Sequence, residues 1–409
     1  MLLAHLLDHL VRQGTLRLID ASGTLHTFSG TSGPVITVRL HDRATERRLF
    51  FNPRLALGEA FMEGTLTVEG GSIYDLLDFI GLNMSLAPRH LLTPLYNGFG
   101  RAFRVFQQYN PLRRARENVA HHYDLSDTLY DLFLDADRQY SCAYFSAPDL
   151  TIEEAQANKK RHLAAKLLLR PGQKVLDIGS GWGGLALYLA KECGVSVTGL
   201  TLSVEQLKVA ERRAAAAGLA DRVRFELRDY REATGTYDRI VSVGMFEHVG
   251  VVHYPTFFRK VKELLADDGV ALLHSISRQD GPGATNPWIR KYIFPGGYSP
   301  AISEVTPVIE RTGLWITDIE ILRLHYAETL RAWRQRFNAN RERVRALYDE
   351  RFCRMWEFYL AGSEIAFRHL GHINFQIQLA KKVDAVPLTR DYITDWERSH
   401  RAPAAERAA

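Results

Sequence analysis

Hydrophobic residues in the front part of the chain are spaced as in strands. Residues 15–70 alternate short strand-like pieces with turns, and the pieces are TLRLID, TLHTFSG, VITVRLHD, RRLFFN and LTVEGG. Alternation with a period of two is typical of half-buried strands, and GSIYDLLDFIGLNMSL then has helical spacing. The first residues, MLLAHLLDHLVRQGTL, also have helical spacing, but polar residues interrupt it and no basic segment precedes it. We interpret them as a surface helix rather than a signal peptide.

From Thr151 onward, helical and strand-like segments alternate. Thr151 and Glu154 match a capping box, and helical spacing continues to Pro171-Gly172. Strand-like segments follow at VLDIG, VSVTGLTL, VRFELRD, RIVSVGM and GVALLHSIS. Such alternation implies right-handed βαβ crossovers and a mostly parallel sheet. The predicted fold class is α/β with a doubly wound, Rossmann-like sheet.

An arginine-rich segment with aromatic residues separates these two regions. It reads LLTPLYNGFGRAFRVFQQYNPLRRARENV, and two interpretations stay open: a solvated helix that caps the core, or a helix that contacts a membrane surface. We therefore predict an α+β lipid-docking domain over residues 1–100, a basic linker over 101–120, a catalytic domain over 121–395 and a disordered tail over 396–409.

Composition narrows the class of partner. A chain of 409 residues with 46% hydrophobic content can fill two cores, and its net charge of +5 suits an anionic partner. Zinc-finger spacing, an RNP-like motif and dense Lys/Arg runs are missing from the sequence, so we predict a lipid partner and no nucleic acid. No stretch approaches the roughly 20 apolar residues that span a bilayer. Three scattered cysteines predict a reducing, cytoplasmic compartment and no metal site.

A glycine-rich turn after the first strand of the second region predicts a cofactor site. Asp177 ends an apolar strand, and Gly179, Gly181 and Gly183 open the next helix with G-x-G-x-G spacing. Dinucleotide sites use G-x-G-x-x-G with a later acidic residue, so this pattern favours S-adenosylmethionine over NAD. A purely structural turn is the alternative.

The next two strands end in polar residues at the same predicted edge of the sheet, where ligands of open α/β sheets bind. The second strand ends in Thr201-Leu202 without the acidic residue that commonly holds ribose hydroxyls, and Ser203-x-x-Gln206 follows. A helix cap explains Ser203 and Gln206 equally well. Asp229-Tyr230 ends the third strand and either flanks an adenine or forms a turn.

Several separated segments resemble the family of cyclopropane fatty acid synthases and mycolic acid cyclopropane synthases. The resemblance covers roughly residues 118 to 383 and is carried by HHYDLSDTLYDLFLD, QYSCAYF, VLDIGSGWGG, GLTLSVEQ, DRIVSVGMFEHVG, LLHSIS, YIFPGG and HYAETL. It implies a class I S-adenosylmethionine-dependent methyltransferase fold with a helical lid. The front region resembles the N-terminal domain of longer, phospholipid-acting members through weaker motifs.

The resemblance also implies which residues form the site. Its cofactor contacts fall on Tyr140, Ser141, Gly179, Gly181, Thr201, Leu202, Gln206, Asp229 and Tyr230. Its catalytic centre, which holds a bicarbonate ion, falls on Cys142, Glu247, His274, Ile276 through its backbone, and Tyr326, with Tyr123 nearby. Two positions depart from close relatives: Ser275 stands where threonine is common, and Tyr230 where the mycolate branch has tryptophan.

These residue types suit the implied reaction. Addition of a methyl group to a double bond leaves a cation, and ring closure then needs a base in an apolar site, which bicarbonate relayed through Glu247 would provide. We expect aromatic faces to stabilise the cation. Without the resemblance, Cys142 and His274 could be core residues, and Glu247 and His248 ordinary residues at a strand end. The expected aromatic faces are Tyr144, Phe145, Phe246, Tyr292 and Phe294.

The sequence thus predicts a cyclopropane-fatty-acyl-phospholipid synthase that uses S-adenosylmethionine and bicarbonate. Its expected substrate is an unsaturated phospholipid acyl chain, reached from the inner face of the membrane as a peripheral protein. Two alternatives stay open: a fatty acid C-methyltransferase that leaves a methyl or methylene branch, and a non-catalytic lipid-binding protein. The oligomeric state is also open, with a homodimer among the possibilities.

Overall fold

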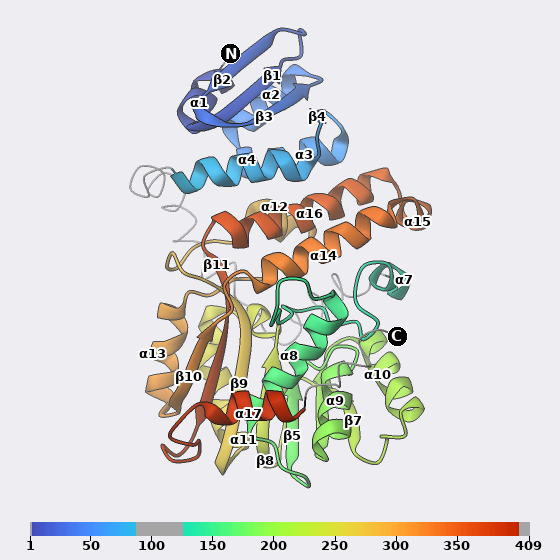
Figure 1. Ribbon diagram of the computed structural model, residues 1–409, viewed down its shortest axis with the longest axis vertical. Helices are drawn as coiled ribbons and strands as arrows, with labels where there is room; N and C mark the ends of the chain where they lie inside the picture. Colours follow the sequence, from blue (N-terminus) through green and yellow to red (C-terminus); the bar gives the residue numbers. More distant parts are fainter. Residues whose placement is uncertain (1, 87–125, 401–409) are drawn as a thin grey trace.

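The chain is arranged in three layers in a computed structural model that describes residues 2–86 and 126–400. A front unit lies at one end of the long axis, a layer of helices follows, and a large sheet with its own helices forms the other end (Figure 1). The predicted basic linker, residues 101–120, lies outside the described residues.

The front unit, residues 2–86, is built on a four-stranded sheet with the order β2-β1-β3-β4. Strands β1 and β3 are parallel, and the outer pairs are antiparallel. The strands predicted within residues 15–20, 24–30, 35–42 and 66–71 and the helix predicted within 71–86 are confirmed. The elements are α1 (Leu2–Leu10), β1 (Gln13–Ile19), β2 (Leu25–Ser29), β3 (Thr31–Leu40), α2 (Arg43–Phe51), α3 (Pro53–Glu63), β4 (Leu66–Glu69) and α4 (Ile73–Leu86).

One predicted strand of the front unit is wrong. Residues 47–52 belong to the end of helix α2 and the residue after it. Asp42 begins this helix by accepting a hydrogen bond from the Thr45 backbone N–H at 2.6 Å, and Thr45 and Leu49, four residues apart, are buried on one face. The residue that marks the start of this helix, Asp42, therefore lies before residues 47–52, which we had predicted to be a strand.

The second unit is built on a seven-stranded sheet with the order β10-β11-β9-β8-β5-β6-β7. Neighbouring strands from β9 to β7 are parallel, while β11 is antiparallel to both of its neighbours. This confirms the predicted α/β class. The strands are β5 (Lys174–Ile178), β6 (Ser196–Thr201), β7 (Val223–Leu227), β8 (Tyr237–Val243), β9 (Leu265–Arg278), β10 (Trp315–Ile321) and β11 (His372–Ala380).

Helices cover both faces of this sheet because successive strand residues point to opposite sides. Val175 packs into a core with α8 and α9, whereas Leu176 packs into another core with α11 and α13. The predicted capping box is confirmed at the start of α8, where Thr151 and Glu154 exchange hydrogen bonds. The helices are α8 (Ile152–Leu167), α9 (Gly184–Cys193), α10 (Val204–Ala216), α11 (Tyr254–Leu264) and α13 (Ile302–Thr312).

Residue 396 does not begin a disordered tail, as we had predicted. Helix α17 (Asp391–Ser399) continues through this position, and it is held against α8 by a 2.7 Å contact between Glu397 and His162. The helix is amphipathic and packs against α8, so the chain stays ordered through residue 399. Residues 401–409 lie outside the described part of the chain.

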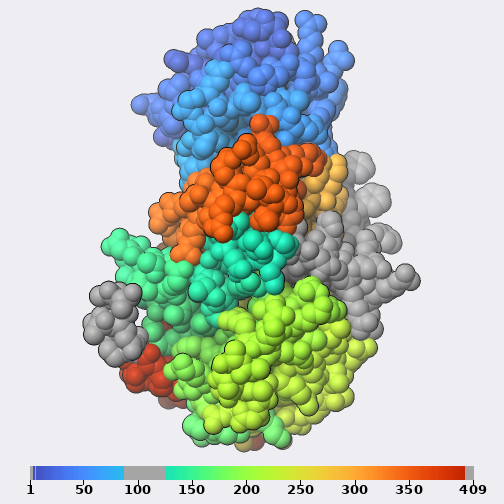
Figure 2. Space-filling model, turned by 90° about the vertical axis from the view of Figure 1, so that its right-hand side faces the viewer, coloured from blue at the N-terminus to red at the C-terminus, as the bar shows by residue number. Residues whose placement is uncertain are grey.

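A layer of helices joins the two units. It consists of α12 (Pro287–Tyr292), α14 (His325–Ala339), α15 (Arg341–Leu347) and α16 (Glu350–His369). Ala361 and Ile365 of α16 complete the core of the front unit, and the indole of Trp288 donates a hydrogen bond to the sulfur of Met62 at 3.2 Å. Figure 2 shows the front unit in direct contact with the α14–α16 region. The front unit is thus packed on this layer rather than tethered beside it.

Candidate active site

A pocket opens at the carboxyl ends of β5, β6, β7 and β8. The chain leaves β5 toward β6 on one side and later returns to β8 on the other, which is the switch point at which open α/β sheets bind ligands. The predicted cofactor residues on its wall are Tyr140, Ser141, Asp177, Gly179, Gly181, Thr201, Leu202, Gln206, Asp229 and Tyr230.

The three glycines of the loop after β5 have different reasons to be glycine. Each has a positive φ, which favours glycine. A Cβ on Gly179 would lie 2.7 Å from the Cβ of Met245, whereas a Cβ on Gly181 would meet nothing within 4 Å and would project into open space. Gly183 does not line the pocket, contrary to our expectation of a cofactor contact. Its missing side chain makes room for Phe225, 2.6 Å from an added Cβ.

Asp177 offers a buried acceptor to a bound ligand. Its side chain is 2% exposed, and its Oδ2 has no hydrogen-bond partner among the described residues. Burial raises the pKa of this carboxyl to about 7. A buried oxygen without a partner is costly, so a ligand donor group in the pocket would stabilise it.

The ends of β6 and β7 are ordered by their own hydrogen bonds. Ser203 caps α10 by accepting the Gln206 N–H at 3.2 Å, while the Gln206 side chain accepts the Thr201 hydroxyl at 2.9 Å. The Gln206 side chain thus binds Thr201 at the pocket wall and does not return a hydrogen bond to Ser203, as a capping box would require. Asp229 lines the pocket, but both of its carboxylate oxygens are bound by Arg231, at 2.8 and 2.7 Å. Its negative charge is therefore neutralised within the turn, as the turn interpretation predicts.

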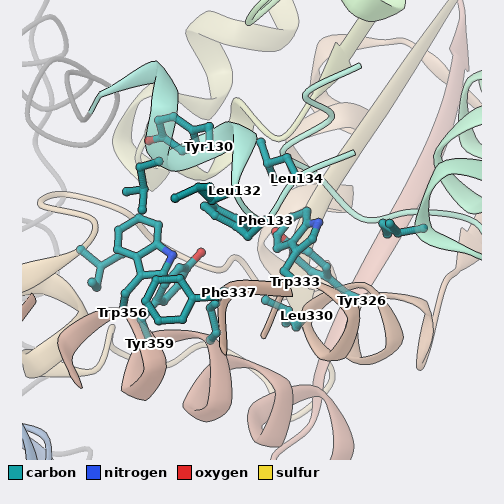
Figure 3. Packing of buried hydrophobic residues seen from close by; sticks show 14 of the residues in the cluster. Tyr130, Leu132, Phe133, Leu134, Tyr326, Leu330, Trp333, Phe337, Trp356 and Tyr359 are labelled. Atoms are coloured by element: carbon teal, nitrogen blue, oxygen red, sulfur yellow. The ribbon is translucent and has the colours of Figure 1, made fainter. Parts of the chain in front are cut away.

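Tyr140 connects the pocket to a large aromatic cluster. Its hydroxyl lies 2.9 Å from that of Tyr359, and its ring centroid is 5.1 Å from that of Trp333. Figure 3 shows this cluster between the helical layer and the segment that contains Tyr130 and Phe133. Its buried aromatic residues include Tyr130, Phe133, Tyr326, Trp333, Phe337, Trp356 and Tyr359.

Glu247 is buried on the turn after β8, residues 246–248. Its Oε1 accepts the Ile276 backbone N–H at 2.7 Å, and its Oε2 has no partner among the described residues. Burial raises the pKa of this carboxyl to about 7. Since Ile276 packs against the aromatic cluster, the bond brings Glu247 to the border of that cluster.

His274 is held on both sides by amides of β11. Its Nδ1 lies 3.2 Å from the Gln376 amide nitrogen and its Nε2 3.4 Å from that of Asn374. Burial lowers its pKa to about 3, so the ring is neutral. A neutral ring has one nitrogen that accepts, so one of the two amide nitrogens can donate a hydrogen bond to it. Both ring nitrogens of His274 are thus taken up by contacts with β11.

Cys142 and Tyr326 belong to the same buried cluster. Burial raises the pKa of the Cys142 thiol above its usual range, so the residue is not an activated nucleophile. The structure therefore places Cys142 and Tyr326 in one buried cluster, bonds Glu247 to Ile276, and packs His274 against two amides of β11. Tyr123 lies outside the described residues.

Four of the five expected aromatic residues, Tyr144, Phe145, Tyr292 and Phe294, pack against the aromatic cluster. Phe246 lies in the core under β8 and β9, stacked on Tyr254 at 4.3 Å, and is corrected to a core residue. Tyr144 stacks between His162 and His325. The Tyr292 hydroxyl donates to Glu59.

The sequence reasoning missed two polar residues on the buried face of α8. Gln156 donates to the backbone oxygens of Gln139 and Ser141 at 3.1 and 3.0 Å, and Lys159 donates to the side chains of the same two residues. Both polar positions fall between the buried residues Ile152 and Leu163 at helical spacing. Two polar residues on the otherwise apolar face of this helix were the feature of the sequence that could have identified them.

Fold and pocket together define a class I S-adenosylmethionine-dependent methyltransferase. The glycine loop, the open space at Gly181 and the unpartnered Asp177 oxygen fit a cofactor that carries hydrogen-bond donors. The sequence profile described as "Mycolic acid cyclopropane synthetase" matches residues 110–377, and the chain belongs to this family. It is an enzyme of the family that transfers methyl or methylene groups from S-adenosylmethionine to fatty acyl lipids.

Known relatives match most of the chain. It is 37% identical over 377 residues to a "Probable fatty acid methyltransferase" of Pseudomonas putida, covering 88% of this chain and 91% of the relative. It is 39% identical over 323 residues to the cyclopropane-fatty-acyl-phospholipid synthase of Escherichia coli, covering 79% and 82%. A crystal structure of the mycolic acid cyclopropane synthase CmaA1 with SAH and CTAB matches with a TM-score of 0.61 and 35% identity, covering 64% and 97%.

Proposed function

We propose that this protein adds a methylene unit to the double bond of an unsaturated phospholipid acyl chain and closes it into a cyclopropane ring. The buried carboxyl of Glu247 carries the proposal. It has one oxygen fixed by Ile276 and one without a partner, at the border of an aromatic cluster that Tyr140 joins to the cofactor pocket. The similarity to the Escherichia coli enzyme supports the same product and substrate.

The aromatic cluster suits the first step. An alkene is a weak nucleophile and must be held close to its electrophile in a dry site; bound S-adenosylmethionine supplies that electrophile as its methyl group. Tyr140, Trp333 and Phe133 are packed ring to ring and exclude water. Their faces would also stabilise a cationic centre on the acyl chain, by roughly 0.5–2 kcal/mol for each contact.

Glu247 suits the second step, which removes a proton from the transferred methyl group. A carboxyl whose pKa is about 7 exists in both protonation states near neutral pH, so it can accept a proton in a site that is otherwise apolar. In our proposal Glu247, with Tyr326 and Cys142, holds a bicarbonate ion, which when bound supplies a base. The free Oε2 of Glu247 fits such a partner, because an ionised carboxylate oxygen can accept a hydrogen bond from the O–H of bicarbonate and then the proton that the ion passes on.

A second product is favoured by the relative from Pseudomonas putida, whose match includes more of this chain than the Escherichia coli match does. A fatty acid methyltransferase would form the same cation and leave a methyl or methylene branch. All of these products come from the same cation: ring closure and a methylene branch each follow loss of a proton, whereas a saturated methyl branch also needs a hydride donor.

The front unit is proposed to bring the enzyme to an anionic membrane surface as a peripheral protein. None of the helices in residues 2–86 and 126–400 combines the length and apolarity needed to cross a membrane. On α2, Phe51 is 76% exposed and Arg47 is also exposed, a combination that suits insertion at a lipid headgroup region. Glu59, between α2 and the helical layer, binds Arg48, Lys291 and the Tyr292 hydroxyl, which ties this face to α12.

Lipid analysis tests the proposal. The purified protein, given S-adenosylmethionine and vesicles of an unsaturated phospholipid, should convert acyl chains to products about 14 mass units heavier, the mass of one methylene group. NMR of the product should show ring protons and no olefinic ones. A branched product would favour the methyltransferase alternative, and no mass gain on any unsaturated phospholipid would overturn the proposal.

A further inference from the structure

A buried ammonium group lies directly behind the cofactor pocket. Lys159 on α8 is 0% exposed. Its Nζ donates to Gln139 Oε1 at 2.6 Å and to Ser141 Oγ at 2.8 Å. Both acceptors are neutral, and both residues line the pocket. A positive charge has therefore been removed from water without direct contact to a negative one.

A second lysine of the same helix shows how unusual this is. Lys166 lies seven residues further along α8 and is equally buried, but it contacts Glu320 and lies 3.4 Å from Asp318. Within the described residues, no carboxylate lies within ion-pair distance of Lys159. Buried charges are normally paired, because an unpaired one costs several kcal/mol. Lys159 thus lacks the partner that Lys166 has.

Three carboxyl groups near Lys159 do not replace that partner, and one of them, Asp137, is already paired with Lys160 and Arg213. Asp135 and Asp177 act on it only at longer range. Burial raises the pKa of both carboxyls, that of Asp177 to about 7, and thereby weakens their negative charge. Desolvation also lowers the pKa of Lys159 to about 8. An anion that enters from the pocket would relieve this imbalance.

The Ser141 hydroxyl connects the ammonium group of Lys159 to the pocket through a hydrogen bond. A hydroxyl has one proton and two lone pairs. Because Ser141 Oγ accepts a hydrogen bond from Lys159, its own proton remains for an acceptor on the pocket side. Gln156 fixes the backbone of this residue through a 3.0 Å bond to its carbonyl. The hydroxyl is thus held in place and polarised by the charge behind it.

We propose that Lys159 is the counter-charge for the carboxylate of the methionine moiety of S-adenosylmethionine and acts on it through the Ser141 hydroxyl. Lys159 is a positioning residue, since Ser141 stands between it and the pocket. The proposal rests on the cofactor and not on the acyl substrate, the product or bicarbonate. It assigns the 139–141 side of the pocket to the amino-acid end of the cofactor.

Calorimetry with two forms of the cofactor tests the charge directly. S-adenosylmethionine and decarboxylated S-adenosylmethionine differ only by the carboxylate. K159M should bind S-adenosylmethionine about 10- to 100-fold more weakly than the wild type, which is the usual range for a hydrogen bond to a charged group. Its affinity for the decarboxylated form should change by less than about 3-fold, because that ligand lacks the group that Lys159 compensates.

The matched control is K166M, measured below its own melting temperature. It removes an equally buried ammonium from the same helix and should leave the ratio of the two affinities at the wild-type value. Equal weakening of both ligands by K159M would show that Lys159 only supports the 139–141 segment. Unchanged binding of both, or the same discrimination in K166M, would also overturn the proposal. If K159M does not fold, K159Q enters the same comparison.

Thermal unfolding without ligand gives a readout that does not depend on cofactor binding. Removal of a buried charge with no carboxylate partner is expected to leave the melting temperature of K159M unchanged or higher. K166M leaves Glu320 with one partner fewer and should melt at a lower temperature. Saturating S-adenosylmethionine should then raise the melting temperature of K159M less than that of the wild type. A ligand-free K159M that melts well below K166M would contradict the proposed imbalance.

Discussion

Two buried carboxyl groups, Asp177 at the end of β5 and Glu247 on the turn after β8, differ in what surrounds them. Burial raises the pKa of both to about 7, and each has one oxygen without a partner among the described residues. Asp177 lines the cofactor pocket near the charge of Lys159. Glu247 has no cation among the groups that shift its pKa, and its other oxygen is fixed by Ile276. In our proposal, carboxyls of similar acidity serve ligand binding at Asp177 (the cofactor end) and proton transfer at Glu247 (the proposed catalytic end).

The largest effect that separates the two ends is expected for Glu247→Gln. The variant keeps the size of the side chain but loses its basicity, so turnover should fall by ~10²-fold or more, the usual contribution of a general base. Affinity for S-adenosylmethionine should stay at the wild-type level. Turnover on vesicles and calorimetry measure the two quantities.

Asp177→Asn is the matched control, since it makes the same change at the cofactor end. It should weaken cofactor binding, and turnover at saturating cofactor should fall less than in the Glu247 variant. Removal of dissolved bicarbonate should slow the wild type and be reversed by adding it back. Near-normal turnover of the Glu247 variant, with no effect of bicarbonate, would exclude this residue as the base.

The two carboxyls should also make the ligand-free protein less stable as the pH rises. The folded-state pKa of Glu247 is raised from 4.5 to about 7, so between these values the folded protein holds a proton that the unfolded chain releases. The free energy of unfolding then decreases with rising pH in this window. A shift of this size corresponds to at most about 3 kcal/mol for one group. Denaturant unfolding of wild type and Glu247→Gln at pH 4.5 and 7.5 measures it.

In the Glu247 variant this part of the pH dependence should disappear, while the part from Asp177 remains. The double variant with Asp177→Asn should lose both. An unchanged slope in both single variants would mean that neither carboxyl is protonated in the folded protein near pH 6. The comparison between the two ends would then rest on geometry alone.

A smaller effect, limited to the cofactor end, is expected for Gly181→Val. The new side chain would project into open space in the pocket and should weaken cofactor binding roughly tenfold or more, about 1.4 kcal/mol or above. Gly172→Val is its control, because Gly172 also has a positive φ and open surroundings but lies outside the pocket. Both variants should lose similar stability, and only the first should lose affinity in calorimetry.

The cofactor end was the more predictable of the two because its residues follow one another along βα units. Asp177 and the glycines are contiguous, and periodicity alone places them at a strand end. The proposed catalytic end consists of Cys142, Glu247 and Tyr326 from distant segments, which only the family resemblance grouped together. Periodicity also could not show that Phe246 faces the core under β8, or that Gly183 makes room for Phe225.

Lys159 illustrates what remained hidden. Helical spacing places Lys159 on the buried face of α8. Its proposed role depends on contacts with Gln139 and Ser141, about twenty residues earlier, and on a pocket formed by four strands, which spacing does not show. The helix α2 was missed for a related reason. Its cap at Asp42 lies before residues 47–52, the segment that we predicted as a strand.

The smallest effect should come from the front unit, and it would separate substrate delivery from both carboxyls. The double substitution Arg47→Glu and Phe51→Ser removes a basic and an exposed aromatic side chain from α2 without touching its buried residues Thr45 and Leu49. Each charge near an anionic membrane contributes about 1 kcal/mol, so activity on anionic vesicles should fall several-fold. Deletion of the whole unit is a poorer test, because α16 completes its core.

The matched control for this double variant is Leu25→Ser, which removes an exposed apolar side chain from β2 of the same unit. It should leave vesicle activity unchanged. In the double variant, cofactor affinity and the pH dependence of stability should both match the wild type, since neither carboxyl is altered. Vesicle sedimentation and turnover with a detergent-dispersed substrate complete the test: binding to anionic vesicles should weaken, while turnover on the dispersed lipid should persist. Equal loss on dispersed and vesicular lipid would show that α2 supports the fold of the helical layer, through Glu59 and α12, and does not contact the membrane.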